Sequence, residues 1–304
     1  PLIDKAEIEK RQDAIADINK HMITREELRE YLNPIYDLER LITRVTYMSA
    51  NPRDLIAFKN SIGMLPPIKT LLEDFDTELL KEIQADMDSL EELYQLIDAS
   101  IMEEPPISVR EGGLIKDGYN ENVDKYRHAK TEGKTWLAEL EAKEREKTGI
   151  KNLKIKFNKV FGYYLEVTNS YKDLVPDYFT RKQTLANAER YITPELKELE
   201  DMILGAEDKL INLEYDLFCE VRNRIAAEVV RIQKTAKAVA KLDAFVSLAV
   251  VADQNNYCRP KINENGVIDI KDGRHPVVEK MMNNDMFIAN DTYLDNGNNR
   301  ISII

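Results

Sequence analysis

The sequence predicts a mainly α fold, in which a helical bundle continues into two long antiparallel helices that carry a small β-containing insert. Two features of the composition favour long helices: charged residues make up 32% of the 304 residues, and glycine and proline number only 11 each. The third observation is the apolar spacing, which repeats every three to four residues on both sides of one segment where it repeats every two. A chain of this length is expected to form two or three domains.

The first hundred residues predict the helical bundle. Apolar side chains recur there at helical spacing, as at Leu28, Tyr31, Leu32, Ile35, Leu38, Leu41, Ile42 and Val45. Prolines at positions 52, 66 and 67 interrupt the pattern and predict helix ends. Two further prolines, Pro105 and Pro106, end the bundle, and the glycine-rich residues 109–118 predict turns or a short hairpin.

Residues 121–147 predict the first long helix, and Gly149 predicts its end. Its apolar stripe steps alternately by three and four through Val123, Tyr126, Lys130, Gly133, Leu137 and Leu140. The remaining faces are rich in charge, and we expect Glu139, Glu141, Glu144 and Glu146 to face solvent.

A β-hairpin is predicted next. Apolar and polar residues alternate over 153–157 and again over 161–168, on either side of a turn near Asn158. Phe157, Phe161 and Tyr163 fall on the apolar side of this pattern, so we predict them to be core residues rather than a base-stacking ladder.

The second long helix is predicted to begin at Pro194, with Thr193 as its N-cap and Glu195 in the first turn. Its apolar stripe alternates steps of three and four as far as Leu217, the spacing of a coiled coil or a long helical hairpin. A helix reaching Arg231 would be about 55 Å long. The hairpin is therefore expected at one end of an antiparallel helical arm.

Several classes of protein are excluded by composition. The net charge of −12 argues against a protein that covers nucleic acid with its whole surface, so any such contact must be local. Cys219 and Cys258 are too few for a disulfide framework, and the three histidines lack metal-ligand spacing. Neither a signal peptide nor an apolar run long enough for a membrane span is expected, which favours a cytoplasmic protein.

Basic residues are concentrated in one place. Residues 151–193 contain eight lysines and arginines against four acidic residues. Lysine and arginine neutralise phosphates, while amide and hydroxyl side chains fix the register of a protein on the sugar-phosphate backbone, so duplex DNA is the expected ligand. The alternative is that these lysines only solvate a strand and protect a sheet edge.

Three segments resemble the MutS family of DNA mismatch-repair ATPases: KEREKTGIKNLKIKFNKVFGYYLEV (residues 143–167), RKQTLANAERYITPELKELE (residues 181–200), and GRHPVVE followed by FIAND. The resemblance extends over essentially the whole chain. It implies a core or lever domain over residues 1–133 and 194–258, interrupted by a clamp domain over residues 134–193. Residues 259–304 would be the first strands of a truncated α/β ATPase domain.

The resemblance also implies site residues and partners. The residues expected to approach the DNA backbone are Lys154, Lys156, Asn158, Lys159, Arg181, Lys182, Gln183, Thr184 and Asn187, while Arg190 would brace the clamp. Phe287 and Ile288 would flank the adenine of ATP in the longer protein, although such an apolar pair also fits a simple core. The longer protein would use ATP and Mg²⁺, form a homodimer, act with downstream mismatch-repair proteins and associate with the nucleoid.

This chain departs from the family pattern in what it lacks. No G-x-x-x-x-G-K-[ST] phosphate loop occurs, so we expect no enzyme activity from it, although the longer protein would be a DNA-dependent ATPase. No counterpart of the family's mismatch-reading domain is present. The chain opens on Pro1 and ends on an apolar run at Ile304, so we expect a piece of a longer protein. Two alternatives remain: a MutS-like paralogue acting on recombination intermediates or branched DNA, and a structural helical scaffold whose tip binds protein.

Overall fold

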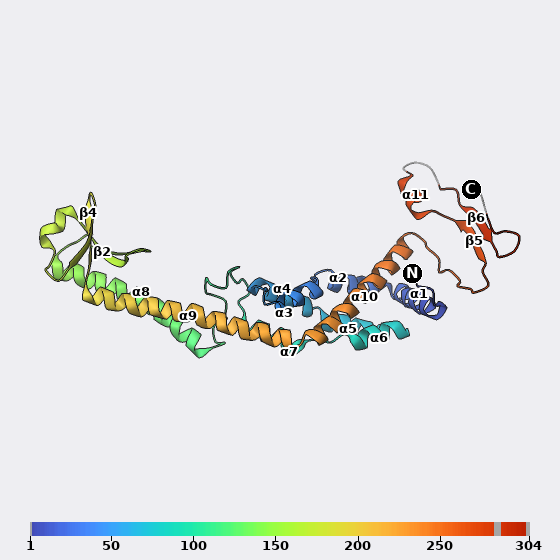
Figure 1. Ribbon diagram of the computed structural model, residues 1–304, viewed down its shortest axis with the longest axis horizontal. Helices are drawn as coiled ribbons and strands as arrows, with labels where there is room; N and C mark the ends of the chain where they lie inside the picture. Colours follow the sequence, from blue (N-terminus) through green and yellow to red (C-terminus); the bar gives the residue numbers. More distant parts are fainter. Residues whose placement is uncertain (1, 283–286, 302–304) are drawn as a thin grey trace. The chain divides into compact units, whose positions relative to one another are not determined.

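The computed structural model describes residues 2–282 and 287–301. It is mainly helical, as predicted, with a small antiparallel sheet (Figure 1). The chain divides into two compact units. One comprises Pro1–Glu30, Thr70–Ala85 and Ala238–Ile304, and the other comprises Tyr31–Lys69 and Asp86–Lys237.

The first unit is built on helices α1 (Lys5–Lys20) and α6 (Glu78–Asp86), the start of α2 (Met22–Leu32), the short η1 (Leu72–Asp74) and the later part of α10 (Val229–Gln254). Buried Asp17 on α1 accepts hydrogen bonds from the backbone N–H groups of Asp76 and Thr77, at 3.0 and 3.1 Å. Arg25 pairs with Asp253 at 3.1 Å, which ties α2 to α10.

Two strands follow α10 in the same unit. Strands β5 (Ile268–Gly273) and β6 (Asn290–Leu294) form an antiparallel pair, and α11 (Pro276–Met281) lies between them in sequence. His275 caps α11 by accepting a hydrogen bond from the Val278 N–H. The strand predicted at the end of the chain lies, apart from Ile301, outside the described residues.

The second unit contains the predicted bundle and the two long helices. Helix α4 (Pro52–Ile62) packs on α3 (Leu38–Thr46) and α7 (Glu91–Ser100), both of which pack on the second long helix. Helix α5 (Leu65–Leu71) starts in this unit. Asn51 and Asp54 form a capping box at the start of α4, where Pro52 predicted a helix boundary. Residues 109–118 form turns, and the only pairing nearby among the described residues is one bridge between Ile101 and Ile115.

Helices α8 (Glu121–Thr148) and α9 (Pro194–Ala227) lie side by side and antiparallel (Figure 1). Helix α8 ends at Gly149 and α9 starts with Thr193 as its cap, both as predicted. A β-carbon at Gly133 would lie 2.6 Å from Ile203 Cγ1, so glycine lets the two helices approach closely at this point. Helix α9 stops at Ala227, slightly before the predicted Arg231, and α10 begins at Val229.

A four-stranded antiparallel sheet lies between α8 and α9 in sequence and at one end of the helix pair in space (Figure 1). The strands are β1 (Lys154–Asn158), β2 (Gly162–Thr168), β3 (Thr180–Thr184) and β4 (Ala188–Ile192), in the order β1-β2-β4-β3. The short η2 (Asn169–Leu174) follows β2. The predicted hairpin is confirmed as β1 and β2, whose pairing runs from Lys154 with Glu166 to Asn158 with Gly162.

One face of the sheet packs on the helix pair and forms a common core. Its members are Leu137, Leu140, Ile150, Leu153, Leu165, Val167, Phe179, Tyr191, Leu196 and Ile203. Tyr163 packs against this cluster, but the prediction that Phe157 and Phe161 are core residues is wrong, because they are 50% and 48% exposed. Phe157 lies on edge strand β1 and Phe161 in the following turn, where no further strand covers them.

The prediction that Glu144 faces solvent is also wrong. Its side chain is buried rather than solvated, and its carboxylate accepts a hydrogen bond from the Tyr178 hydroxyl at 2.7 Å. Tyr178 belongs to the segment between η2 and β3 that folds back over the end of α8, which removes Glu144 from water.

Candidate nucleic-acid interface

The two faces of the sheet follow from the strand register, because residues paired directly across antiparallel strands project from the same face. Leu165 pairs with Tyr191, which pairs with Arg181, so these three residues share the inner face that packs on the helices. The outer face carries the other residues, namely Lys154, Lys156, Tyr164, Glu166, Arg190 and Gln183.

Arg190 organises the outer face. Its guanidinium lies 4.4 Å from the centre of the Tyr164 ring and donates a hydrogen bond to Gln183 Oε1 at 2.8 Å. These contacts join β2, β4 and β3, which is the bracing position that the family resemblance implied for Arg190. Gln183 uses its carbonyl oxygen in this bond, so its amide nitrogen remains the donor group that could meet a phosphate.

Lys156 is exposed on the outer face but already has an ionic partner. Its ammonium lies 2.7 Å from Glu166 Oε1, and this hydrogen bond raises the pKa of Lys156 above its ordinary value. Lys154 lies directly opposite Glu166 in the strand register. The outer face therefore presents two lysines and a braced arginine around one half-buried glutamate.

The two turns that carry predicted site residues lie at opposite ends of the sheet. Asn158 pairs with Gly162, the first residue of β2, whereas Ala188, directly after Asn187, pairs with Thr168, the last residue of β2. A strand of this length spans roughly 20 Å. Asn158 and Lys159 are thus separated from Asn187, and the predicted residues form no single patch.

An irregularity in the register of strand β3 determines the faces from which its residues project. Arg181 pairs with Tyr191 and Gln183 with Arg190, so Lys182 is the additional residue of a bulge. Arg181 therefore projects from the inner face and Gln183 from the outer face, and both Arg181 and Lys182 are exposed because β3 is an edge strand. Thr184, opposite Glu189, is exposed on the inner-face side.

Glutamate carboxylates of α8 and α9 fix the sheet to both long helices. Glu200 on α9 accepts a hydrogen bond from the Tyr163 backbone N–H at 2.6 Å, and Glu141 on α8 accepts one from the Ile155 N–H at 2.7 Å. Together with the bond from Tyr178 to Glu144, these contacts connect strands β1 and β2 and the segment before β3 to the helices. The sheet is consequently held by polar contacts as well as by its apolar core.

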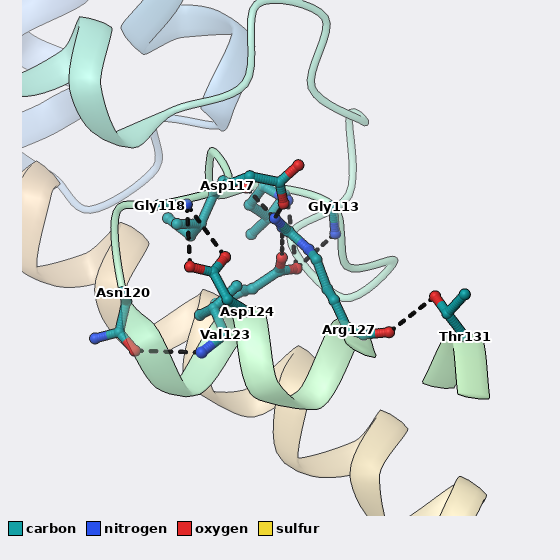
Figure 2. A network of polar contacts seen from close by, with 11 residues as sticks. Gly113, Asp117, Gly118, Asn120, Val123, Asp124, Arg127 and Thr131 are labelled. Atoms are coloured by element: carbon teal, nitrogen blue, oxygen red, sulfur yellow. Dashed lines mark hydrogen bonds and ion pairs between the residues drawn. The ribbon is translucent and has the colours of Figure 1, made fainter. Parts of the chain in front are cut away.

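A second polar network lies further along the helix pair (Figure 2). Fully buried Glu214 on α9 accepts hydrogen bonds from the backbone N–H groups of Gly113 and Leu114, at 2.5 and 3.3 Å, and pairs with Arg127 on α8. Gly112 and Gly113 both have positive φ angles, which turns successive N–H groups toward one anion.

Arg127 extends this network to the loop before α8. It also pairs with Asp117 and donates a hydrogen bond to the Ile115 carbonyl oxygen at 2.6 Å (Figure 2). Asp124 accepts two hydrogen bonds from the Gly118 N–H at 3.1 and 3.2 Å. The loop of residues 112–118 is therefore attached to both long helices through Glu214, Arg127 and Asp124.

Comparison with known proteins gives the family. Residues 1–249 match the family model of MutS domain III. The chain belongs to the MutS domain III family. Similar proteins include the DNA mismatch repair protein MutS of Lachnoclostridium phytofermentans, which is 66% identical over the whole chain, and those of Acetivibrio thermocellus and Caldicellulosiruptor bescii, at 53% and 54%. The chain spans about a third of the length of these MutS relatives, at 33%, 35% and 35%.

The match to MutS domain III stops before the residues proposed to meet a nucleotide. Phe287 is half-buried and Ile288 is 80% exposed, so Ile288 is not the core residue that the simpler interpretation suggested. Within residues 2–282 and 287–301, no group of three or more histidine, cysteine or acidic residues is placed to hold a metal ion. No helix of the described part is both long and apolar enough to cross a membrane.

Proposed function

We propose that this chain is the lever and clamp part of a DNA mismatch repair protein, and that its clamp contacts the backbone of duplex DNA without sequence specificity. In this proposal the lever comprises residues 1–133 and 194–258, the clamp comprises residues 134–193, and residues 259–304 begin an ATPase domain. The longer protein would bind ATP and Mg²⁺, act as a homodimer with downstream repair proteins, and associate with the nucleoid.

The observation that carries the proposal is the exposure of five basic side chains on one small sheet and its first turn, in a chain that is acidic overall. Lys154, Lys156, Lys159, Arg181 and Lys182 are all exposed. Because the chain carries a net charge of −12, a polyanion is repelled by most of its surface and attracted only locally. The amide of Gln183 and the exposed Thr184 and Asn187 supply neutral donors beside these cations.

The separation of the two turns suits a long ligand. A duplex presents phosphates continuously along its axis, so groups roughly 20 Å apart can contact different stretches of the same backbone. A small anion could not reach across this distance. The glutamates that bond the sheet to α8 and α9 support the lever part of the proposal, since a sheet fixed to both helices moves with them as one body.

The experiment is binding of the 304-residue chain to a homoduplex at several salt concentrations. Replacing Arg181 and Lys182 by alanine should weaken binding to all sequences alike and reduce the slope of log K against log salt by about 1.8, which is about 0.9 for each lost phosphate contact. The matched control removes two exposed lysines from the helix pair, Lys125→Ala with Lys209→Ala, and should leave the slope unchanged.

Two other outcomes would redirect the proposal. Binding that does not depend on salt, or that the Arg181 and Lys182 variant leaves intact, would favour the scaffold that binds protein. Tighter binding to branched DNA than to homoduplex would favour the paralogue that acts on recombination intermediates.

A further inference from the structure

Glu189 on β4 is a buried carboxylate with two exposed cations attached to it. Its Oε1 lies 3.0 Å from Lys172 Nζ and 3.5 Å from Arg181 Nη1, and its Oε2 accepts a hydrogen bond from the Tyr191 hydroxyl. These partners come from η2, β3 and β4. One carboxylate thus joins three elements that are separate in sequence.

The exposures of these side chains differ sharply. The Glu189 side chain is 4% exposed, whereas those of Lys172 and Arg181 are 54% and 58% exposed. An ammonium group has three N–H donors and a guanidinium has five, so each cation keeps donors for a ligand while one faces Glu189. Glu189 itself has almost no surface on which a ligand could bind.

Charge and protonation favour an anionic ligand at this point. Two cations share one carboxylate, which leaves an excess positive charge at the surface. The hydrogen bonds from Tyr191 and Lys172 lower the pKa of Glu189, so it stays ionised at neutral pH and keeps both cations in place.

The location complements the predicted site. η2 is attached to the turn between β3 and β4, because the Asn169 N–H donates to the Asn187 carbonyl oxygen at 3.2 Å and the Asn169 amide to the Ala186 carbonyl oxygen at 3.0 Å. Lys172 therefore places an ammonium group at the end of the sheet where Asn187 lies. Sequence alone did not indicate Lys172 as a contact residue, because Asp173 follows it directly.

We propose that Lys172 is a further DNA-phosphate contact, and that Glu189 is the positioning residue that holds it beside Arg181 so that both side chains meet the same stretch of backbone. This inference rests on the proposed function of the clamp. Glu189 touches no DNA in this arrangement and acts only through the two cations.

The first test is Lys172→Ala in the 304-residue chain, measured with a fluorescent homoduplex over a range of salt concentrations. Loss of one phosphate contact should reduce the salt slope by about 0.9 and weaken binding about five- to tenfold at 0.1 M salt. Lys172→Arg should retain binding, and Lys209→Ala on α9 serves as the control for loss of one exposed lysine. An unchanged slope for Lys172→Ala would overturn the role of Lys172.

The second test is Glu189→Gln, which keeps the size of the side chain and an oxygen that can accept the Tyr191 hydrogen bond. The variant is more positive than the wild type, so electrostatics alone predicts tighter DNA binding. If Glu189 positions the two cations, the variant should bind DNA more weakly and with a lower salt slope, because Lys172 and Arg181 are no longer held together. Tighter binding would overturn the positioning role, and circular dichroism with a melting curve checks that the variant is folded.

The outcomes separate this inference from the proposed function. If the wild-type chain shows no salt-sensitive DNA binding, both are wrong. If Arg181→Ala with Lys182→Ala weakens binding while Lys172→Ala and Glu189→Gln do not, only the present inference is wrong. If Glu189→Gln fails to fold, the Lys172→Ala result still decides whether this end of the sheet contacts phosphate.

Discussion

Three glutamates of the helix pair, Glu144, Glu200 and Glu214, are buried close to apolar core residues of the same helices. They lie four residues after Leu140, Leu196 and Leu210 respectively. All three are buried, and each accepts hydrogen bonds from the sheet or the loop that packs on the helices. Because a buried carboxylate without partners costs several kcal/mol, a buried glutamate on these helices indicates a polar partner on a neighbouring element.

Tyr191 gives a prediction at the same scale. Burial, together with its hydrogen bond to Glu189, raises the pKa of Tyr191 to about 12. In the unfolded chain tyrosine titrates near 10, so the neutral hydroxyl stabilises the fold fully below pH of about 10, and this contribution is lost as the pH rises through about 12. Tyr191→Phe removes the titration. The stability advantage of the wild type over this variant should therefore shrink by on the order of 2 kcal/mol between these pH values.

The measurement is denaturant unfolding of both proteins from pH 8 upward, since the difference between them cancels the other tyrosines. Tyr47→Phe is the control, because Tyr47 is 79% exposed. A constant difference for Tyr191→Phe across the alkaline range would show that Tyr191 titrates normally.

Secondary-structure elements with strong local signals were predictable from the sequence. Thr193 and Pro194 predicted the start of α9, Gly149 predicted the end of α8, and alternation around Asn158 predicted β1 and β2. The hairpin of β3 and β4 carried no such alternation, because Arg181 and Lys182 lie on an edge strand and a bulge shifts the register there.

Local sequence patterns also did not predict which parts of the sheet are covered by other elements. Period-two spacing placed Phe157 and Phe161 on an apolar side, but the order of strands leaves them half exposed. The separation of Asn158 from Asn187 likewise depends on the pairing of β2 with β4, which joins residues far apart in sequence. The exposure of the two phenylalanines and the separation of the two asparagines therefore both depend on how the strands are ordered and paired.

The packing of the two long helices gives a prediction at the scale of elements. Gly133 faces Ile203 so closely that an added β-carbon would clash, whereas a β-carbon at Gly205 on α9 would meet nothing within 4 Å. Gly205→Ala should raise the free energy of unfolding by up to about 1 kcal/mol through helix propensity. Gly133→Val should lower it by about 1–3 kcal/mol, because overpacking forces the helices apart.

Urea unfolding of the two variants, followed by circular dichroism, tests this contrast with Gly205→Ala as the matched control. If Gly133→Val is as stable as the wild type, the close contact with Ile203 does not set the spacing of α8 and α9.

At the scale of the whole molecule, the proposed DNA contact depends more on where the charges lie than on the net charge. A net charge of −12 coexists with a segment of eight basic and four acidic residues. Four of those bases are exposed on the strands, and a fifth is exposed in the turn between β1 and β2. Repulsion between DNA and the acidic remainder would direct the duplex toward the clamp, and this steering should weaken as salt screens it. The composition predicted a local contact, and the family resemblance named the residues expected to make it. Only the fold shows that these residues are divided between two ends of a sheet.

The most direct test of phosphate contact by the clamp is the affinity of the wild-type chain for a homoduplex as a function of salt. Five exposed cations, of which Lys156 already pairs with Glu166, predict a slope of log K against log salt of about −3.6 to −4.5. The same slope should be found for duplexes of unrelated sequence. A slope near zero, or binding confined to one sequence, would contradict the proposal that this sheet binds the DNA backbone.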